Sequence, residues 1–281
     1  MIDLHTHSNA SDGTEAPAAL VASAVAAGLR VVALTDHDTT LGWAEASEAA
    51  RHTDLALVPG IEVSCGRGRG SLHLLAYLPD PTHPELVAEL ERARESRDSR
   101  LDRMVGKMAA AGVPVSIEAV RAEVEPGATP GRPHIADALV RAGVVDHRDE
   151  AFTRWLSDDS PYYVSHYAPD PVRAVRVVRA AGGVPVVAHP SSRTRTGTVG
   201  DVLIEELAAA GLGGLEVRHR DHEEADVRHL TDLAAQLGLF VTGSSDYHGT
   251  GKRNRLGENT TDPEVLERIE AEGTGTDVVR S

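Results

Sequence analysis

Short apolar runs alternate with amphipathic helical stretches over much of the chain. The first run covers residues 2–5, a stretch rich in Ala and Val follows at residues 17–27, and a second, almost continuously apolar run covers residues 30–35. A continuous apolar run of this length is typical of a strand buried on both faces of a sheet. The beginning of the chain therefore predicts a β-α-β unit.

The same alternation returns later in the chain. Strands are predicted at residues 55–63, 183–188, 214–217 and 239–243, and helices at residues 171–181, 201–210 and 223–237. Strands that alternate with helices favour an α/β fold with a parallel sheet that is closed or nearly closed.

Residues 80–163 break this alternation, because they contain no convincing buried strand and begin with a long charged helix predicted at residues 84–111. We expect residues 1–79 and 164–272 to form one barrel and residues 80–163 to form a helical insertion over the barrel mouth. The alternative is a set of outer helices without contact to the site. Residues 273–281 are expected to be poorly ordered.

Composition and charge narrow the class of protein. The 281 residues include 28 basic and 43 acidic side chains, which gives a net charge of −15. This charge disfavours tight binding of long nucleic acid, whereas small anionic substrates remain possible where bound metal ions reverse the local potential. Cys65 is the single cysteine, so no intramolecular disulfide is expected. The start MIDLHTH lacks the features of a signal peptide and no apolar run is long enough to span a membrane, so we expect a cytoplasmic protein without membrane contact.

Candidate metal ligands come at the ends of the predicted strands. His5 and His7 are two residues apart, as are Asp246 and His248, and residues at this spacing in a strand point to the same side. Imidazole nitrogens and carboxylate oxygens together suit Mn, Fe or Zn. One such pair alone is weak evidence, because two polar residues often lie at a strand end without a metal.

Four further apolar runs carry a candidate ligand. VVALTDHD ends near His37, ALVPGIEV carries Glu62, SLHLLAYL carries His73, and VPVVAHP ends near His189. Singly, His73 could be a core histidine and Glu62 a solvated acid. Together they predict one shared site at the carboxyl ends of the strands, where barrel and open-sheet enzymes place their chemistry.

The order of these motifs resembles the PHP (polymerase and histidinol phosphatase) family of metal-dependent phosphoesterases. The resemblance rests on HTH with Asp12, TDHD, GIE, AHP and the final D-x-H, over residues 1–249. It implies a distorted (β/α)7 TIM-like barrel with three divalent metal ions, Mn²⁺, Fe²⁺ or Zn²⁺. The implied ligand sets are His5, His7, Glu62 and Asp246 for one ion, Glu62, His73 and His189 for a second, and Asp12, His37 and His248 for a third. Some relatives have histidine where this chain has Asp12, which could alter the metal preference. Asp36 is interpreted as a carboxylate that orients an imidazole.

The segment GRPHIA, at residues 131–136, has a different character. It resembles the GRPH signature of a PHP branch that contains nucleoside 3′,5′-bisphosphate phosphatases and 5′-to-3′ exonucleases acting on short RNA. The planar guanidinium of Arg132 matches phosphate oxygens, so Arg132 is the candidate phosphate clamp. His134 could contact the phosphate or protonate the leaving oxygen. The alternative is an ordinary helix start, with Pro133 in the first turn and Arg132 solvated.

Other residues carry weaker predictions. His219 and His222 could line the substrate pocket, with solvent-facing loop positions equally compatible with the sequence. Tyr162, Tyr163 and Tyr167 could stack on a base, with core packing as the alternative.

These residues suggest a mechanism and a substrate class. Closely spaced divalent ions lower the pKa of bound water and stabilise charge on both oxygens of a phosphoryl displacement. In this hypothesis Glu62 and Asp246 hold and bridge the ions, Arg132 offsets phosphoryl charge and His134 is the general acid. The expected substrate is a nucleoside 3′,5′-bisphosphate losing its 3′-phosphate, or a short 5′-phosphorylated oligoribonucleotide. The alternatives are a histidinol-phosphate phosphatase and an inactive metal-binding module that serves a partner. The sequence does not predict an oligomeric state.

Overall fold

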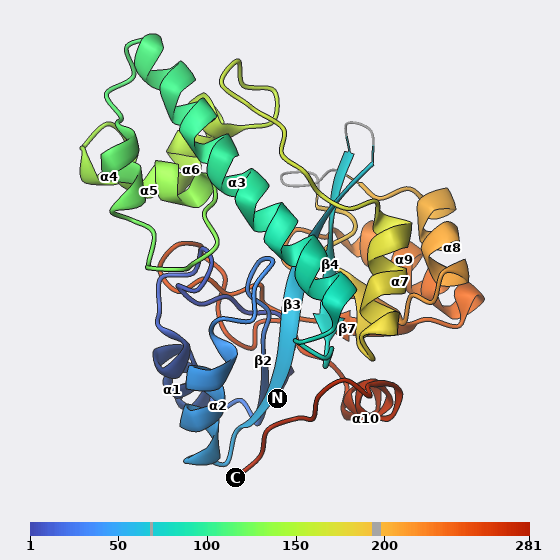
Figure 1. Cartoon of the computed structure of the whole chain (residues 1–281). Helices are drawn as coiled ribbons and strands as arrows, with labels where there is room; N and C mark the ends of the chain where they lie inside the picture. The colour runs from blue at the N-terminus through green and yellow to red at the C-terminus, as the bar shows by residue number, and fades with distance from the viewer. Residues whose placement is uncertain (68–69, 193–197) are drawn as a thin grey trace.

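The strands form a nearly closed barrel. The computed structural model describes residues 1–67, 70–192 and 198–281 (Figure 1). Within these residues one seven-stranded sheet runs in chain order through β1 (Ile2–Asp3), β2 (Val31–Leu34), β3 (Ala56–Arg67), β4 (Gly70–Tyr77), β5 (Val184–Val187), β6 (Gly214–Arg218) and β7 (Phe240–Gly243). Just past the edge strands β1 and β7, Thr6 and Tyr247 form a parallel bridge, and the backbone N–H of His7 donates to the carbonyl of Tyr247 at 2.8 Å. This bridge joins the two edges of the sheet, and the predicted distorted barrel is confirmed.

The predicted all-parallel sheet is wrong at β4. The pairs β1–β2, β2–β3, β5–β6 and β6–β7 are parallel, but β4 runs antiparallel to both β3 and β5. The reason is the length of the connection. β3 extends to Arg67 and β4 begins at Gly70, which leaves no room for the crossover that a parallel pair requires.

Five helices of the described chain cover the outside of the barrel, and a sixth, α10, packs against the hydrophobic cluster of the inner strand faces (Figure 1). They are α1 (Pro17–Ala26), α2 (Trp43–Arg51), α7 (Pro171–Ala180), α8 (Asp201–Ala209), α9 (Glu224–Leu237) and α10 (Pro263–Glu272). Strand residues alternate between two hydrophobic clusters: Val32 and Leu34 join the cluster that packs on these helices, and Val31 and Ala33 join the cluster shared by the inner strand faces and α10. In the part of the chain that the structure describes, no helix is both long and apolar enough to cross a membrane.

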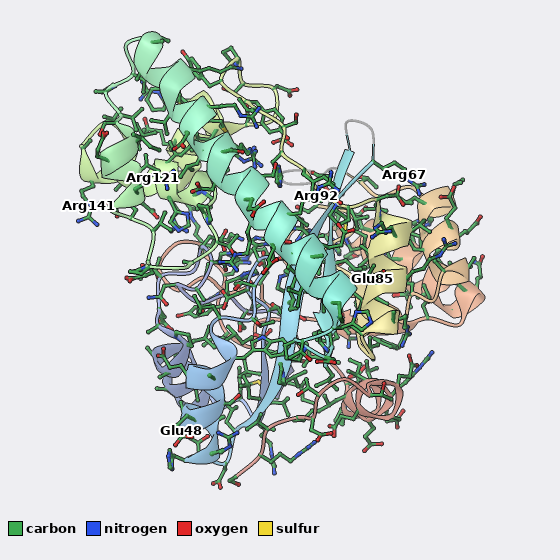
Figure 2. All side chains as sticks on the ribbon, viewed as in Figure 1. Glu48, Arg67, Glu85, Arg92, Arg121 and Arg141 are labelled. Atoms are coloured by element: carbon green, nitrogen blue, oxygen red, sulfur yellow. The ribbon has the colours of Figure 1, made fainter. Side chains whose placement is uncertain are left out.

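Residues 84–156 form a helical region with its own hydrophobic cluster, which includes Met104, Ile135 and Leu139. Its elements are α3 (Pro84–Ala110), α4 (Ile117–Arg121), α5 (Arg132–Arg141), α6 (Arg148–Ala151) and a π-helical turn (Phe152–Leu156). Figure 2 shows Arg141 at the outer edge of this region.

The helical region contacts the loops at the carboxyl ends of the first two strands. The N–H of Thr129 donates to the carbonyl of Ala10 at 3.0 Å. Arg148 Nη1 donates to the carbonyl of Asp12 at 3.0 Å, and Arg97 Nε donates to Asp38 Oδ2 at 2.8 Å. The region therefore touches the loops that carry candidate ligands.

Residues 273–281 do not form the poorly ordered tail that the sequence predicts. Leu57 and Val279 exchange two backbone hydrogen bonds of 2.9 Å, and the N–H of Thr276 donates to the carbonyl of Leu78 at 3.0 Å. Val278 is only 9% exposed. The segment is too short and polar to show a periodic pattern, but its backbone pairing and one buried valine fix it to the barrel.

Candidate metal centre

The predicted metal ligands gather at one end of the barrel, at the carboxyl ends of the parallel strands and the amino end of the antiparallel β4. His5, His7 and Asp12 follow β1, His37 follows β2, His189 follows β5, and Asp246 and His248 follow β7. Glu62 and His73 lie within β3 and β4. All are buried except His73, which is half-buried. Segments far apart in the sequence thus deliver imidazoles and carboxylates to one place.

One group of ligand atoms surrounds a single oxygen of Glu62. Glu62 Oε2 lies 3.1 Å from His5 Nε2 and 2.9 Å from His7 Nε2. Asp246 Oδ1 lies 3.5 Å and 3.4 Å from the same two nitrogens. The four side chains could hold one metal ion, because their ligand atoms all lie within 4.8 Å of one another.

The other oxygen of Glu62 faces a second group. Glu62 Oε1 lies 2.7 Å from His73 Nδ1 and 3.2 Å from His189 Nε2. His37 Nδ1 lies 3.4 Å from Glu62 Oε2, and His37, Glu62 and His73 form a further set that could hold an ion. Glu62 therefore lies between two groups of candidate ligands, and His37 approaches Glu62 as well as Asp12, which the resemblance does not imply.

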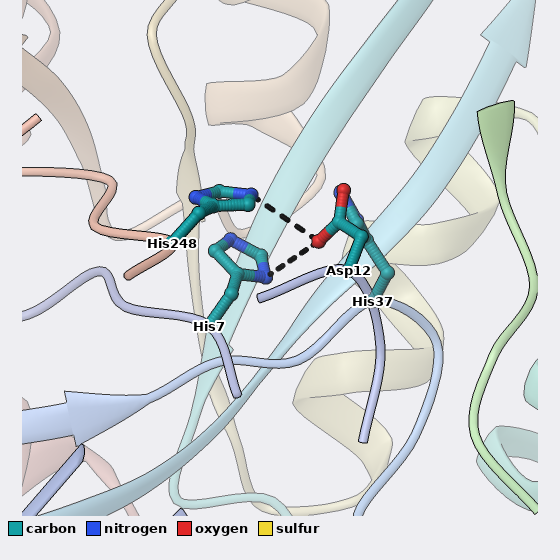
Figure 3. A group of neighbouring side chains, drawn as sticks. All are labelled: His7, Asp12, His37 and His248. Carbon is teal, nitrogen blue, oxygen red and sulfur yellow. Dashed lines mark ion pairs between the residues drawn. The ribbon is translucent and has the colours of Figure 1, made fainter. Parts of the chain in front are cut away.

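The third group is drawn in Figure 3. Asp12 Oδ1 lies 3.2 Å from His248 Nε2 and 3.7 Å from His7 Nδ1. Asp12 Oδ2 lies 3.8 Å from His37 Nε2. His7 presents one ring nitrogen to this group and the other to Glu62, so it belongs to two groups.

A tight turn after β1 brings Asp12 back to His7. The N–H groups of Ser11 and Gly13 both donate to the carbonyl of Ser8, at 3.2 Å and 3.0 Å. A Cβ atom at Gly13 would lie 2.3 Å from the carbonyl oxygen of His7, so only glycine permits this approach. The DG step in the sequence thus has a direct role in forming the third group.

Two of the candidate ligands have strained backbone conformations. His189 has a φ of 29° and Asp246 a φ of 54°, positive values that are uncommon for residues other than glycine, although His and Asp adopt them more often than most. Such strain clusters at functional sites, where surrounding structure holds it in place. For Asp246 the turn aims the carboxylate back toward His5 and His7.

Asp36 supports the loop after β1 and does not contact an imidazole directly. It accepts hydrogen bonds from Ser8 N–H at 2.8 Å, Ser8 Oγ at 2.6 Å and Ser11 Oγ at 2.6 Å. Ser11 Oγ lies 3.5 Å from His7 Nδ1. Burial raises the pKa of Asp36, although these hydrogen bonds oppose the increase. The predicted orienting role therefore acts through Ser11 and is directed at His7.

Glu216 of β6 is a functional residue that the sequence reasoning missed. It is fully buried; His5 Nδ1 lies 3.0 Å from its Oε1, and the N–H of His189 donates to its Oε2 at 2.7 Å. Burial disfavours charge on His5, but Glu216 and Glu62 outweigh it and raise the pKa of His5 to about 9. The sequence GLEVR contains the clue, because a single acid stands there between two apolar residues. Leu215 and Val217 belong to the hydrophobic cluster that packs on the helices, so Glu216 points into the barrel.

The ligand atoms fit divalent metal ions. His37 Nδ1, His73 Nδ1 and His248 Nε2 are buried and make no hydrogen bond, although carboxylate oxygens lie close to each of them. Imidazole lone pairs and carboxylate oxygens that converge without hydrogen-bond geometry are the arrangement expected of metal ligands. The donor set of several nitrogens with shared carboxylates suits a cluster of ions.

Arg132 and His134 lie at the start of α5. Arg132 Nη1 donates to the carbonyl of Leu156 at 2.7 Å and pairs with Asp158, so Arg132 is not the solvated residue of an ordinary helix start. His134 is buried, and its Nδ1 accepts from the N–H of Gly131 at 3.0 Å. The same nitrogen lies 3.3 Å from the carbonyl oxygen of Gly131, to which it would donate in the other tautomer. Burial lowers the pKa of His134, so the ring is neutral near pH 7.

His219 and His222 have different surroundings. His219 is buried, and its Nε2 lies 3.6 Å from Asp246 Oδ2, which also lies 3.3 Å from Lys252 Nζ. His219 is thus part of the centre and does not face solvent. His222 borders a hollow beside His219, but its Nδ1 donates to the carbonyl of Val217 at 2.8 Å and its Nε2 accepts from Ser191 N–H at 3.2 Å. The backbone occupies both of its ring nitrogens, so a substrate-binding role for His222 is not supported.

Comparison with known proteins gives consistent matches. A model of the PHP domain matches residues 3–94. The chain is 34% identical over 261 residues to a 3′,5′-nucleoside bisphosphate phosphatase of Chromobacterium violaceum, covering 93% of this chain and 92% of that protein. It is also 34% identical over 258 residues to a 5′-3′ exoribonuclease of Haemophilus influenzae, and this match covers 92% of this chain and 93% of that protein. A solved structure from Bifidobacterium adolescentis, described as a metal-dependent phosphoesterase, has a TM-score of 0.94 at 40% identity and covers 97% of this chain and 96% of that chain.

Proposed function

The chain belongs to the PHP family of metal-dependent phosphoesterases, and from that premise we propose that it removes the 3′-phosphate of nucleoside 3′,5′-bisphosphates or hydrolyses short 5′-phosphorylated oligoribonucleotides. The observation that carries the proposal is the position of Glu62, whose two oxygens face separate groups of histidines at the barrel mouth. Similarity to the two relatives over more than nine-tenths of both lengths supports the nucleotide class of substrate.

We assign the residues of the centre to metal binding as follows. Glu62 would be shared by two ion positions, one held together with Asp246, His5 and His7 and the other with His73, His189 and His37. Asp12 and His248 complete a third position with His7 and His37. Divalent ions, of the Mn²⁺, Fe²⁺ or Zn²⁺ type, supply Lewis-acid stabilisation of phosphoryl charge and activation of water when bound there.

The protein residues around the ions hold the reacting group. Glu216 fixes the ring of His5 so that its Nε2 faces Glu62. Arg132 offsets the negative charge of the phosphoryl oxygens. His134 is neutral because its pKa is lowered, and it forms a hydrogen bond with the substrate, a narrower role than the general acid expected from sequence. Lys252, close to Asp246, adds a further positive charge.

Two alternatives are less well supported. A histidinol-phosphate phosphatase would belong to the same family, but the two relatives cited above act on nucleotides or RNA. An inactive metal-binding module would need the same ligands, but similarity over more than nine-tenths of both lengths to two relatives named as a phosphatase and an exoribonuclease favours an active enzyme.

One experiment tests the proposal. The purified protein is analysed for bound metal and assayed with Mn²⁺ for hydrolysis of adenosine 3′,5′-bisphosphate, a short 5′-phosphorylated RNA and histidinol phosphate. We expect hydrolysis of the bisphosphate or the RNA, abolished in Asp246→Asn. Turnover of histidinol phosphate alone would overturn the substrate class, and no turnover of any of the three would overturn the proposed activity.

A further inference from the structure

The first residue of α6, Arg148, joins the helical region to the loop that carries Asp12. Its Nε and Nη2 donate to the two carboxylate oxygens of Asp137 on α5, at 2.6 Å and 2.7 Å. Its Nη1 donates to the backbone carbonyl of Asp12 at 3.0 Å. Only 12% of the Arg148 side chain is exposed. Two parallel bonds to one carboxylate fix the plane of the guanidinium, so the direction of the third bond, to Asp12, is fixed as well.

Arg148 lies at the place where the barrel closes. Just past the bridge that joins β1 to β7, the backbone N–H of Thr14 donates to the carbonyl of His248 at 3.2 Å. A Cβ atom at Gly251 would collide with Arg148 Nη1, so the guanidinium packs directly on the loop after β7. The same nitrogen bonds Asp12 in the loop after β1. Arg148 therefore contacts both of the loops that meet at this closure.

The third group of candidate ligands spans the same closure. His7 and Asp12 follow β1, whereas His248 follows β7, and Asp12 Oδ1 lies 3.2 Å from His248 Nε2 (Figure 3). The position of Asp12 relative to His248 therefore decides whether one ion can bind both of them. Arg148 contacts the backbone of Asp12 and the loop that continues from His248. It is placed to fix that relative position.

The anchor of Arg148 lies on the helix that carries the residues assigned to the phosphate. Asp137 is one turn after His134 on α5, which begins at Arg132. Burial is the main cause of the lowered pKa of His134. The charges of Asp12 and Asp137 oppose this shift and that of Arg148 adds to it, which places all three close to the ring. The contacts from Asp12 through Arg148 to Asp137 thus link the third group to α5.

We propose that Arg148 is a positioning residue for the third ion: anchored by Asp137, it holds Asp12 in place opposite His248. The inference rests on the proposed function and deepens it, because it makes the helical region responsible for the affinity of one ion position in the barrel. Arg148 bonds the backbone of Asp12, so the carboxylate stays directed at His7 and His248. Partners that hold a metal ligand from behind tune the affinity of the site without touching the ion.

The test follows the binding of Mn²⁺ to the metal-free, full-length protein by calorimetry. Arg148→Gln removes the bonds to Asp137 and Asp12 and should weaken one binding step roughly tenfold or more, as changes to the partners of metal ligands do. Asp137→Asn keeps Arg148 but weakens its anchor, so it should weaken the same step by a smaller factor. Arg154→Gln, at an exposed arginine of the same helical region, is the matched control and should leave every step unchanged.

A double variant identifies the step that changes. Asp12→Asn weakens the third ion position directly. Because Arg148 acts through Asp12, Asp12→Asn combined with Arg148→Gln should bind Mn²⁺ no more weakly than Asp12→Asn alone. A role of Arg148 limited to folding would instead make the two losses add, and it would weaken every binding step together.

Three results would overturn the inference: unchanged Mn²⁺ affinities in Arg148→Gln and Asp137→Asn, an equal loss at every step, and additive losses in the double variant. If Arg148→Gln does not fold, Asp137→Asn with and without Asp12→Asn gives the same comparison. These measurements are independent of turnover. An inactive wild type in which Arg148→Gln still weakens one step would therefore refute only the proposed function.

Discussion

At the scale of single residues, the side chains behind the candidate ligands set the geometry of the centre. Glu216 contacts the ring of His5 and the backbone of His189. These two histidines lie on opposite sides of Glu62, in two different groups of candidate ligands. Glu216→Gln keeps the shape of the side chain but removes its negative charge and one hydrogen-bond acceptor. The affinity of the centre for metal should therefore fall roughly ten- to hundredfold. A Mn²⁺ titration of metal-free protein measures this. Glu267→Gln, exposed on α10, is the control; equal affinity in Glu216→Gln and wild type would show that Glu216 is only structural.

Arg132 provides a second prediction at this scale. Since it is assigned to phosphoryl charge and contacts none of the candidate ligands, Arg132→Ala should lower kcat/KM for the phosphate substrate about a hundredfold or more while bound metal stays at the wild-type amount. Metal analysis and steady-state kinetics on the same preparation measure both. Arg132 also bonds Leu156 and Asp158, so melting temperature is followed, with the exposed Arg154→Ala as control. Loss of metal in Arg132→Ala would mean that the residue supports the centre structurally.

At the scale of elements, local patterns in the sequence predicted most strands and helices but not how every strand is directed. The continuous apolar run of β2 and the motif after it predicted both the strand and the ligand position of His37. The direction of β4 was missed because strand period and apolar character are the same for parallel and antiparallel neighbours. Glu216 was missed for a related reason: which face of β6 points inward depends on the closed barrel.

The C-terminal segment provides a prediction for an element that the sequence did not reveal. Removal of residues 274–281 deletes the backbone pairing of Val279 with Leu57 and the buried Val278. Several hydrogen bonds and one valine correspond to about 3 kcal/mol of unfolding free energy. Urea unfolding measures the change. Removal of Arg280 and Ser281 alone, which deletes an exposed ion pair with Glu270, should cost less than about 1 kcal/mol. Equal stability of the longer truncation and the full chain would show that the pairing contributes little.

At the scale of the whole molecule, charge is distributed unevenly. The protein has a net charge of −15, and most of its arginines pair with carboxylates on the surface, as Arg121 does with Asp98 and Asp102. Such a surface disfavours long polyanions. Arg97 of α3 is buried instead, and it donates to Asp38, which follows the candidate ligand His37. The outer surface of the protein is therefore acidic, whereas a buried arginine lies close to the candidate ligands.

Metal binding should also stabilise the whole barrel. The candidate ligands come from β3, β4 and the segments after β1, β2, β5 and β7, so ions held by them connect strands around most of the sheet. Mn²⁺ at a hundred times its dissociation constant should stabilise the fold by about 2.7 kcal/mol, which corresponds to a rise in melting temperature of roughly 5 °C or more. Calorimetric melting with Mn²⁺ and with a chelator measures this difference. Asp246→Asn should show a smaller rise, because it removes a shared carboxylate, whereas the exposed Arg103→Gln should show the full rise. The same melting temperature with and without metal would contradict a metal centre built into the barrel, since ions that bridge six strand ends cannot bind the native state without stabilising it.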